Sequence, residues 1–125
     1  MLDFTGITCV NCRAMETAVW SDPEVIKRLK NDFILVSLYD DAREIPLARE
    51  DCYVSKVSGK QITTLGDKCL DIEIDKYNSN GMPMYFFIDE NETKLADNGY
   101  PYIPDVKKFV EHLESVKAKY KKTHS

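Results

Sequence analysis

The stretch Phe4-Thr5-Gly6-Ile7-Thr8-Cys9-Val10-Asn11-Cys12-Arg13 decides the fold of this chain. An apolar segment ends in a short loop, and two cysteines separated by two residues open the helix that should follow. One helical turn holds both sulfurs close enough to bond. The start of a helix also offers unpaired N–H groups and a partial positive charge, and both favour a thiolate. In an α/β chain this arrangement predicts a thiol–disulfide site at Cys9 and Cys12.

Size and composition predict a single domain, residues 1–125, with a core of its own. Apolar residues make up 43% of the chain and charged residues 30%, which is ordinary for a soluble globular protein. The net charge of −4 argues against nucleic-acid binding, because the one basic segment, Lys117–Lys122, suits the end of a final helix. No stretch approaches the roughly 20 apolar residues that cross a bilayer.

The start of the chain leaves two interpretations open. Met1 runs straight into Leu-Asp-Phe with no secretory signal, so the protein is either cytosolic or a domain cut from a longer precursor. We favour the second interpretation, because Met1–Phe4 has the pattern of the tail of a buried strand.

The first half of the chain predicts a broken helix followed by a strong strand. Ser21 and Glu24 have the spacing of a capping box, and a proline between them suits a first helical turn, so the helix should break near Ser21. The nearly continuous apolar run Phe33–Tyr39 predicts a central strand covered on both faces. The apolar helix positions expected to face the core are Met15, Val19, Trp20, Val25, Ile26 and Leu29.

In the second half of the chain, the sequence pattern predicts little regular secondary structure before residue 68 and well-defined helices and strands after it. Residues 42–68 suggest only a short helix near Pro46–Asp51 and a hairpin or irregular segment around Val57–Ile62. A helix over Asp67–Tyr77 should stop at Asn78-Ser79-Asn80-Gly81. The remaining expected elements are a strand at Met84–Ile88, an antiparallel partner at Thr93–Ala96 and a helix from about Pro104 with an apolar stripe of Val106, Phe109, Val110, Leu113 and Val116.

This order, with Cys-x-x-Cys after the first strand and a proline before the third, resembles the thioredoxin fold. The run Asp-Phe-Thr-Gly-x-x-Cys-Val-Asn-Cys-Arg, then Met-Glu and Val-Trp-Ser-Asp-Pro-Glu-Val, resembles the C-terminal periplasmic domain of the DsbD family of thiol:disulfide interchange proteins. The specific part covers roughly residues 2–40. The implied fold is α/β, with a central mixed β-sheet flanked by helices. It would be truncated at the N-terminus and enlarged between the second and third strands.

The resemblance implies a function and a location. The chain would be a periplasmic domain of an inner-membrane protein and act as a protein-disulfide reductase. It would take electrons from a transmembrane domain of the same longer protein and pass them to oxidised extracytoplasmic proteins, including those of cytochrome c maturation. A monomeric domain with no metal and no cofactor beyond its redox-active disulfide is expected. The long segment 42–68 and the missing upstream part depart from the better-known members.

The two active-site cysteines should have different roles. Cys9, in the loop, is the expected nucleophile, and Cys12, one turn into the helix, should resolve the mixed disulfide. The alternative is an inert bridge between adjacent turns. Val10 and Asn11 set the redox balance, and because neither is a cationic histidine that would stabilise a thiolate, we expect a reducing pair.

Two acidic residues are candidates for proton transfer. Asp3 lies in an apolar strand six residues before Cys9, where a carboxylate is unfavourable unless it is hydrogen-bonded or protonated. Glu16 lies four residues after Cys12 on the same helix face. The resemblance supports both, since the family carries acidic residues at these places. The alternative is that each is an ordinary carboxylate, solvated in the case of Glu16.

The expected substrate-binding residues surround the thiols. The Met82-Pro83 bond should be cis in this fold, which would turn the Met82 backbone outward to pair with an extended substrate segment. A trans proline at the start of a strand is the alternative. Ile7 and Thr8 should form an apolar rim around Cys9.

The other cysteines and the histidines are weaker signals. Cys52 and Cys69 form no second zinc half-site, so they are either a structural disulfide or two buried free thiols. His112 and His124 are expected at the surface. Two other functions stay open beside the relay. One is a thioredoxin-like binding or chaperone module with non-essential cysteines, and the other is a free cytosolic reductant.

Overall fold

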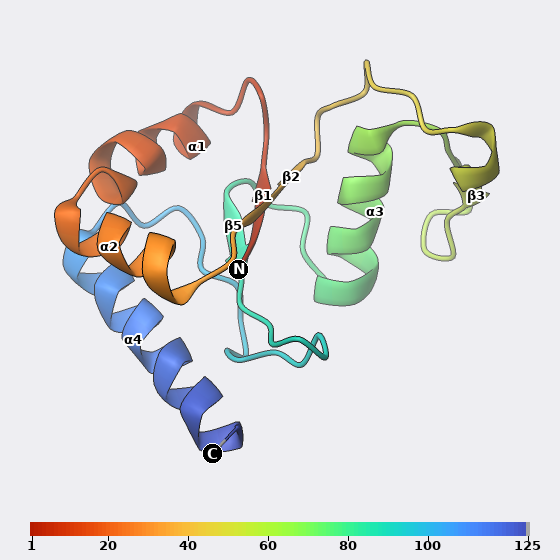
Figure 1. The fold of residues 1–125 in the computed structure, drawn as a ribbon. Helices are drawn as coiled ribbons and strands as arrows, with labels where there is room; N and C mark the ends of the chain where they lie inside the picture. Colours follow the sequence, from red (N-terminus) through yellow and green to blue (C-terminus); the bar gives the residue numbers. More distant parts are fainter. Residues whose placement is uncertain (125) are drawn as a thin grey trace.

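The computed structural model describes residues 1–124 and is built around a three-stranded mixed sheet (Figure 1). The central strand β1 (Leu2–Thr5) pairs in parallel with β2 (Val36–Tyr39) and antiparallel with β5 (Met84–Phe86). In this register Asp3 lies between Ser37 and Tyr85. The expected α/β class, with a mixed sheet and flanking helices, is confirmed.

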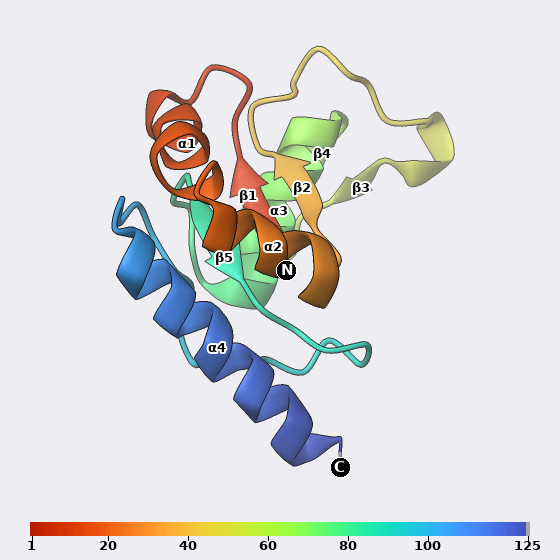
Figure 2. The same cartoon turned by 60° about the vertical axis from the view of Figure 1, so that its left-hand side comes forward.

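Helices cover both faces of the sheet. On one face lie α1 (Val10–Met15), the π-helical segment η1 (Glu16–Trp20), α2 (Pro23–Asp32) and α4 (Val106–Thr123). The helix α3 (Leu65–Tyr77) lies on the other face (Figures 1 and 2). Among residues 1–124, no helix combines the length and apolar character needed to cross a membrane.

The core is divided by the sheet into two clusters. Tyr85 belongs to the cluster under α1, α2 and α4, and its neighbour Phe86 belongs to the cluster under α3. This follows from the alternation of side chains along a strand. Phe4 and Tyr77 complete the smaller cluster, with ring centroids 5.8 Å apart. The larger cluster buries Met15, Val19, Val25, Phe109, Leu113 and Val116, as the helix patterns predict.

The helix breaks near Ser21 as expected, but the predicted capping box is wrong. The N-cap of α2 is Asp22, whose carboxylate accepts a hydrogen bond from the Glu24 N–H at 2.9 Å. The residue before a proline is driven out of the helical region, and Asp22 is extended, so it takes the cap position ahead of Pro23. The face of α2 is also narrower than expected, because Ile26 is exposed.

The strand at Val36–Tyr39 is not the central strand that its apolar run suggested. It forms one edge of the sheet, and Ile34 and Val36 are exposed. The central place belongs to β1, which is shorter and carries Asp3. A run of apolar residues indicates a strand, but it does not distinguish a central strand from an edge.

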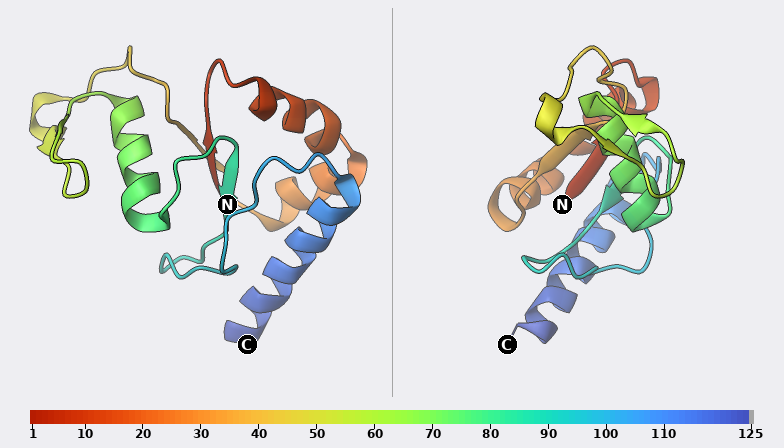
Figure 3. Two further views of the ribbon diagram at one scale, coloured as in Figure 1. Left: turned by 180° about the vertical axis from the view of Figure 1, so that it is seen from behind. Right: turned by 90° about the vertical axis from the view of Figure 1, so that its right-hand side faces the viewer.

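The segment between β2 and α3 is the expected enlarged region. It contains a 3₁₀ turn at Arg49–Asp51 and a small hairpin of β3 (Tyr53–Val54) and β4 (Gln61–Ile62). The hairpin is therefore present, with bounds shifted from those expected, and the short helix near Pro46–Asp51 is reduced to one turn. Figure 3 shows the hairpin projecting beyond α3, to which the Tyr53 hydroxyl donates a hydrogen bond at Asp71 (2.6 Å).

The last third of the chain follows the expected order with shorter strands. Asn78 ends α3 in the left-handed conformation (φ 50°), which confirms the stop signal, and the Met82-Pro83 bond is cis. The strand expected at Met84–Ile88 ends at Phe86. The expected antiparallel return at Thr93–Ala96 is present, but it is reduced to an isolated bridge between Lys94 and Ile88 and does not form a strand.

Candidate functional site

Cys9 and Cys12 are joined in a disulfide at the start of α1, with their Cα atoms 5.2 Å apart. Cys9 is the N-cap residue, and its sulfur accepts a hydrogen bond from the Cys12 N–H at 3.2 Å. The two sulfurs have different access to solvent, because Cys9 is partly exposed and Cys12 is 1% exposed. The loop sulfur is therefore the one that another protein can reach.

The loop before Cys9 is held by Asp41, which sequence reasoning missed. Its carboxylate accepts hydrogen bonds from the N–H of Ile7 (2.8 Å), the N–H of Thr8 (3.2 Å) and the Thr8 hydroxyl (3.2 Å). Burial opposes ionisation, but these donors hold the pKa of Asp41 below its usual range. The signal in the sequence was the position of Asp41 after β2, since parallel strands end at the same edge of a sheet.

Asp3 lies on the face of the sheet that α1 covers. It is 2% exposed, and one of its carboxylate oxygens accepts a hydrogen bond from the Ser37 hydroxyl at 3.1 Å. Burial raises the pKa of Asp3 to about 6, against the opposing effect of the Ser37 hydrogen bond, and the nearby Glu16 carboxylate adds to the rise. A carboxyl group with this pKa gains and loses its proton near neutral pH.

Glu16 forms an ion pair with Arg13, which also reaches the end of β1. The Arg13 guanidinium lies 3.0 Å from the Glu16 carboxylate and 3.0 Å from the Thr5 hydroxyl. Glu16 remains about one third exposed. The sequence did not indicate Arg13 as part of this network, because only the fold brings the end of β1 against the first turn of α1.

Met82 and Pro83 come immediately before β5. Phe4, near the end of β1, pairs with Met84 at the start of β5, so the chain that enters β5 and the loop that follows β1 lie at the same end of the sheet. Ile7, Val10 and Met82 are exposed apolar residues. Thr8 and Asn11 are exposed as well. The predicted substrate-binding residues thus lie at the end of the sheet where the Cys9 loop begins.

Besides Asp3 and Glu16, a second pair of carboxyl groups, Asp40 and Glu73, is buried between the end of β2 and α3. Asp40 is 3% exposed and Glu73 is fully buried. If both carboxyl groups were ionised, three of their four oxygens would have no hydrogen-bond donor among the described residues. The Ser79 hydroxyl donates to the remaining Glu73 oxygen at 2.7 Å. Burial, a hydrogen bond to Glu73 and the Glu73 charge raise the pKa of Asp40 to about 9. A proton on Asp40, shared with Glu73, supplies the missing donor.

Cys52 and Cys69 are free thiols rather than a disulfide. Cys69 is buried against this carboxyl pair, and burial raises the pKa of its thiol. His112 is not the surface residue expected, because it packs on the Phe87 and Tyr100 rings and burial lowers its pKa. His124 stacks on the Tyr120 ring.

Possible metal ligands meet away from the thiols. Asp89, Glu90 and His124 place one ligand atom each within 4.8 Å of one another at the end of α4. The His124 ring nitrogen Nε2 lies 2.9 Å from a Glu90 carboxylate oxygen, a contact that accounts for the group without a metal.

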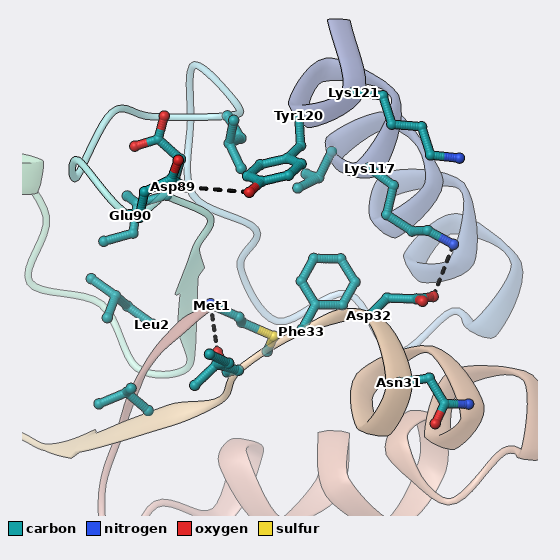
Figure 4. A pocket seen from close by; sticks show the side chains of 15 residues that line it. Met1, Leu2, Asn31, Asp32, Phe33, Asp89, Glu90, Lys117, Tyr120 and Lys121 are labelled. Atoms are coloured by element: carbon teal, nitrogen blue, oxygen red, sulfur yellow. Dashed lines mark hydrogen bonds and ion pairs between the residues drawn. The ribbon is translucent and has the colours of Figure 1, made fainter. Parts of the chain in front are cut away.

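A cavity of about 670 Å³ opens at the opposite end of the sheet from Cys9 (Figure 4). Met1 and Leu2 line it at the start of β1, with Phe33 across from them. An ion pair between Lys117 and Asp32 (2.8 Å) lies at its rim. None of the predicted site residues lines this cavity, so it is separate from the thiol site.

Comparison with known proteins identifies the chain at the level of a family. A family model described as a thioredoxin-like domain matches residues 1–117. No curated protein matches the chain.

Proposed function

The chain belongs to the thioredoxin-like domain family, and from this we propose that it is a protein-disulfide reductase acting through Cys9 and Cys12. The family and the Cys-x-x-Cys pair support thiol–disulfide exchange in general. The observation that carries the proposal is the unequal burial of the two sulfurs, an accessible Cys9 and an inaccessible Cys12 at one helix start.

The first step belongs to Cys9. In the reduced domain its thiolate attacks one sulfur of a substrate disulfide, forming a Cys9–substrate disulfide and releasing the other substrate sulfur as a thiolate. The N–H of Cys12, which points at the Cys9 sulfur at 3.2 Å, stabilises the negative charge before attack.

The second step belongs to Cys12. Its thiol loses a proton to the Asp3 carboxylate, and the thiolate attacks the Cys9 sulfur. The Cys9–Cys12 disulfide forms, the second substrate sulfur leaves as a thiolate, and two electrons have passed to the substrate. The raised pKa of Asp3 suits this exchange; burial is the main cause of the rise, and the Glu16 charge adds to it.

The cellular role that we propose is an electron relay. The sequence resemblance to the DsbD family favours a periplasmic domain that receives electrons from a transmembrane domain of the same longer protein. Oxidised extracytoplasmic proteins, including those of cytochrome c maturation, would be the acceptors, and the extended edge at Met82 and Pro83 would bind them.

The direct test is reduction of insulin disulfides with dithiothreitol as the electron source. Wild-type protein should accelerate reduction, and Cys9→Ser should fall to the rate without protein, because no thiol remains at the exposed position. Cys52→Ser is the matched control and should keep full activity. Equal activity of wild type and Cys9→Ser would refute the reductase and favour a binding module.

We expect Asp3→Asn to remove the pH dependence that Asp3 gives to the second step. Between pH 5 and 8, the wild-type rate should rise with an inflection near pH 6, which the variant should lack. The variant should nevertheless be more stable at pH 7, by about 3 kcal/mol, because it no longer buries a charge. Rates by insulin reduction and stability by urea unfolding would check this. An unchanged inflection would exclude Asp3 as the proton acceptor.

A further inference from the structure

We propose that a second cavity, beside the loop that carries Cys9, receives an aliphatic side chain of the substrate protein. The inference rests on the proposed function and adds to it a substrate class, disulfides flanked by aliphatic residues. The cavity has a volume of about 330 Å³, at the small end of the range for ligand pockets, which suits a side chain better than a cofactor. Its lining is mostly apolar: Ile7, Arg13, Tyr39, Ala42, Ile45 and Leu65.

The far wall of the cavity is a rigid structure built by the enlarged segment. The Leu65 N–H donates to the Ile45 carbonyl at 2.8 Å, and the Gly66 N–H donates to the Ala42 carbonyl at 3.0 Å. The start of α3 lies so close to this turn that a Cβ at Gly66 would come within 2.6 Å of the Ala42 nitrogen. The backbone at Ile45 and Leu65 is therefore joined directly, and both residues lie on one wall of the cavity.

The near wall is continuous with the reactive sulfur. Ile7 lines the cavity two residues before Cys9, and Asp41 fixes the Ile7 backbone. Ile7 and Ile45 are 58% and 50% exposed, an arrangement that leaves apolar surface on both sides of the opening. Both loops rise at the same end of the sheet (Figures 1 and 2). A protein whose disulfide contacts Cys9 must lie over this opening or next to it.

The strand order explains how one segment reaches two binding elements. β2 and β5 flank β1 on opposite sides, so the cavity lies on the β2 side of the loop and Met82 on the β5 side. A segment that crosses Cys9 in an extended conformation would meet Met82 with the residues on one side of its cysteine. The residues on the other side would reach the cavity.

The chemistry of the lining selects an aliphatic occupant. Arg13 is its one charged residue, and its guanidinium is already bound by Glu16 and Thr5. An acidic side chain would have to compete with Glu16 for it. A serine or asparagine side chain would lose its hydrogen bonds to water and gain only contacts with methyl groups, which is unfavourable. A leucine side chain would bury its own apolar surface and that of Ile7 and Ile45.

The experiment compares disulfide-bonded peptides that carry leucine or serine two residues before or two residues after the cysteine. Only one of the two leucine positions should reach the cavity. Wild type should reduce the peptide with leucine at that position with a kcat/KM about ten-fold above that of the peptide with serine there, which is the scale of discrimination expected from methylene groups in an apolar pocket. Ile45→Ser should lose this preference. Val54→Ser, which changes an exposed aliphatic residue on the hairpin, should retain it. Oxidised glutathione, which has no side chain for the cavity, should react equally with all three proteins.

The outcomes separate the two proposals. If wild type reduces none of the disulfides, the reductase function fails. If it reduces them all with equal kcat/KM for leucine and serine peptides, or if Ile45→Ser keeps the preference, the cavity is not the binding site and the reductase function stands. Thermal unfolding of Ile45→Ser, monitored by circular dichroism, checks that the fold of this variant is intact.

Discussion

The Cys12→Ser variant is expected to accumulate a mixed disulfide with its substrate, joined through Cys9. Attack by Cys9 needs only the exposed sulfur, whereas release of the product needs a second thiol behind it. Cys12 is 1% exposed, so its replacement by serine changes little at the surface that meets the substrate. The adduct should be nearly stoichiometric, against almost none for wild type. Non-reducing electrophoresis and intact mass measurement would quantify it.

The Cys12→Ser variant that traps the mixed disulfide should be made in a protein that lacks Cys52. Cys52 is a partly exposed free thiol and could form adducts that have nothing to do with the site. In the Cys52→Ser background, Cys12→Ser should trap and Cys9→Ser should not, while peptide mapping should place the bond on Cys9. Trapping through Cys12 in the Cys9→Ser protein would reverse the roles that we assign. The same variant in an extract of the source cells would capture the natural partner.

The parts of the site that the sequence predicted are local in the chain. Cys9 and Cys12 are three residues apart, and the buried position of Asp3 follows from its place in an apolar strand. The cis bond at Pro83 is expected from the resemblance to the thioredoxin fold. Short-range patterns carry this information, because spacing along a helix or strand fixes which side chains share a face. The roles of these residues in catalysis stay predictions.

The parts that the sequence missed depend on which strands become neighbours. The apolar run at Phe33–Tyr39 could not reveal that its strand is an edge, because periodicity describes faces and not neighbours. Asp41 binds Ile7 across 34 residues, and Ser37 binds Asp3 across the same separation. Both contacts require the parallel pairing of β1 with β2. Likewise, the cap is Asp22 rather than Ser21, because Pro23 restricts the residue before it to an extended conformation, which suits the N-cap position.

The pair of Asp40 and Glu73 also lay outside the reach of the sequence, since one comes from a strand end and the other from the middle of a helix. Nothing in the spacing of the acidic residues on α3 separates Glu73 from the less buried acids Asp67, Asp71 and Asp75. The fold buries it because its face of α3 packs on β2. Burying a carboxyl group in such a place is unfavourable unless hydrogen-bond partners satisfy it.

Asp40→Asn is expected to stabilise the domain at alkaline pH and to flatten its pH dependence. The pKa of Asp40 is raised from an unfolded value near 3.8 to about 9, so folding takes up one proton between these limits. Its contribution to stability is complete below pH 3.8 and is lost as pH rises to about 9. The loss is about 1.4 kcal/mol for each pH unit. An asparagine amide can donate to Glu73 without taking up a proton, so the variant should escape this loss.

The clearest window for that measurement is pH 6.5 to 8.5. Above pH 6, Asp3 is ionised in both states and no longer contributes. Burial lowers the pKa of the Met1 amino group and of His112, so these two groups make stability rise with pH. Wild type and variant share both groups, so their effect cancels in the difference in stability between the two proteins.

Urea unfolding should show Asp40→Asn more stable than wild type by at least about 2 kcal/mol at pH 8, and the difference should widen as pH rises. Asp75→Asn, an exposed change on α3, should leave the wild-type slope intact. Parallel curves for wild type and Asp40→Asn would mean that Asp40 is ionised in the folded domain and that no proton is shared with Glu73.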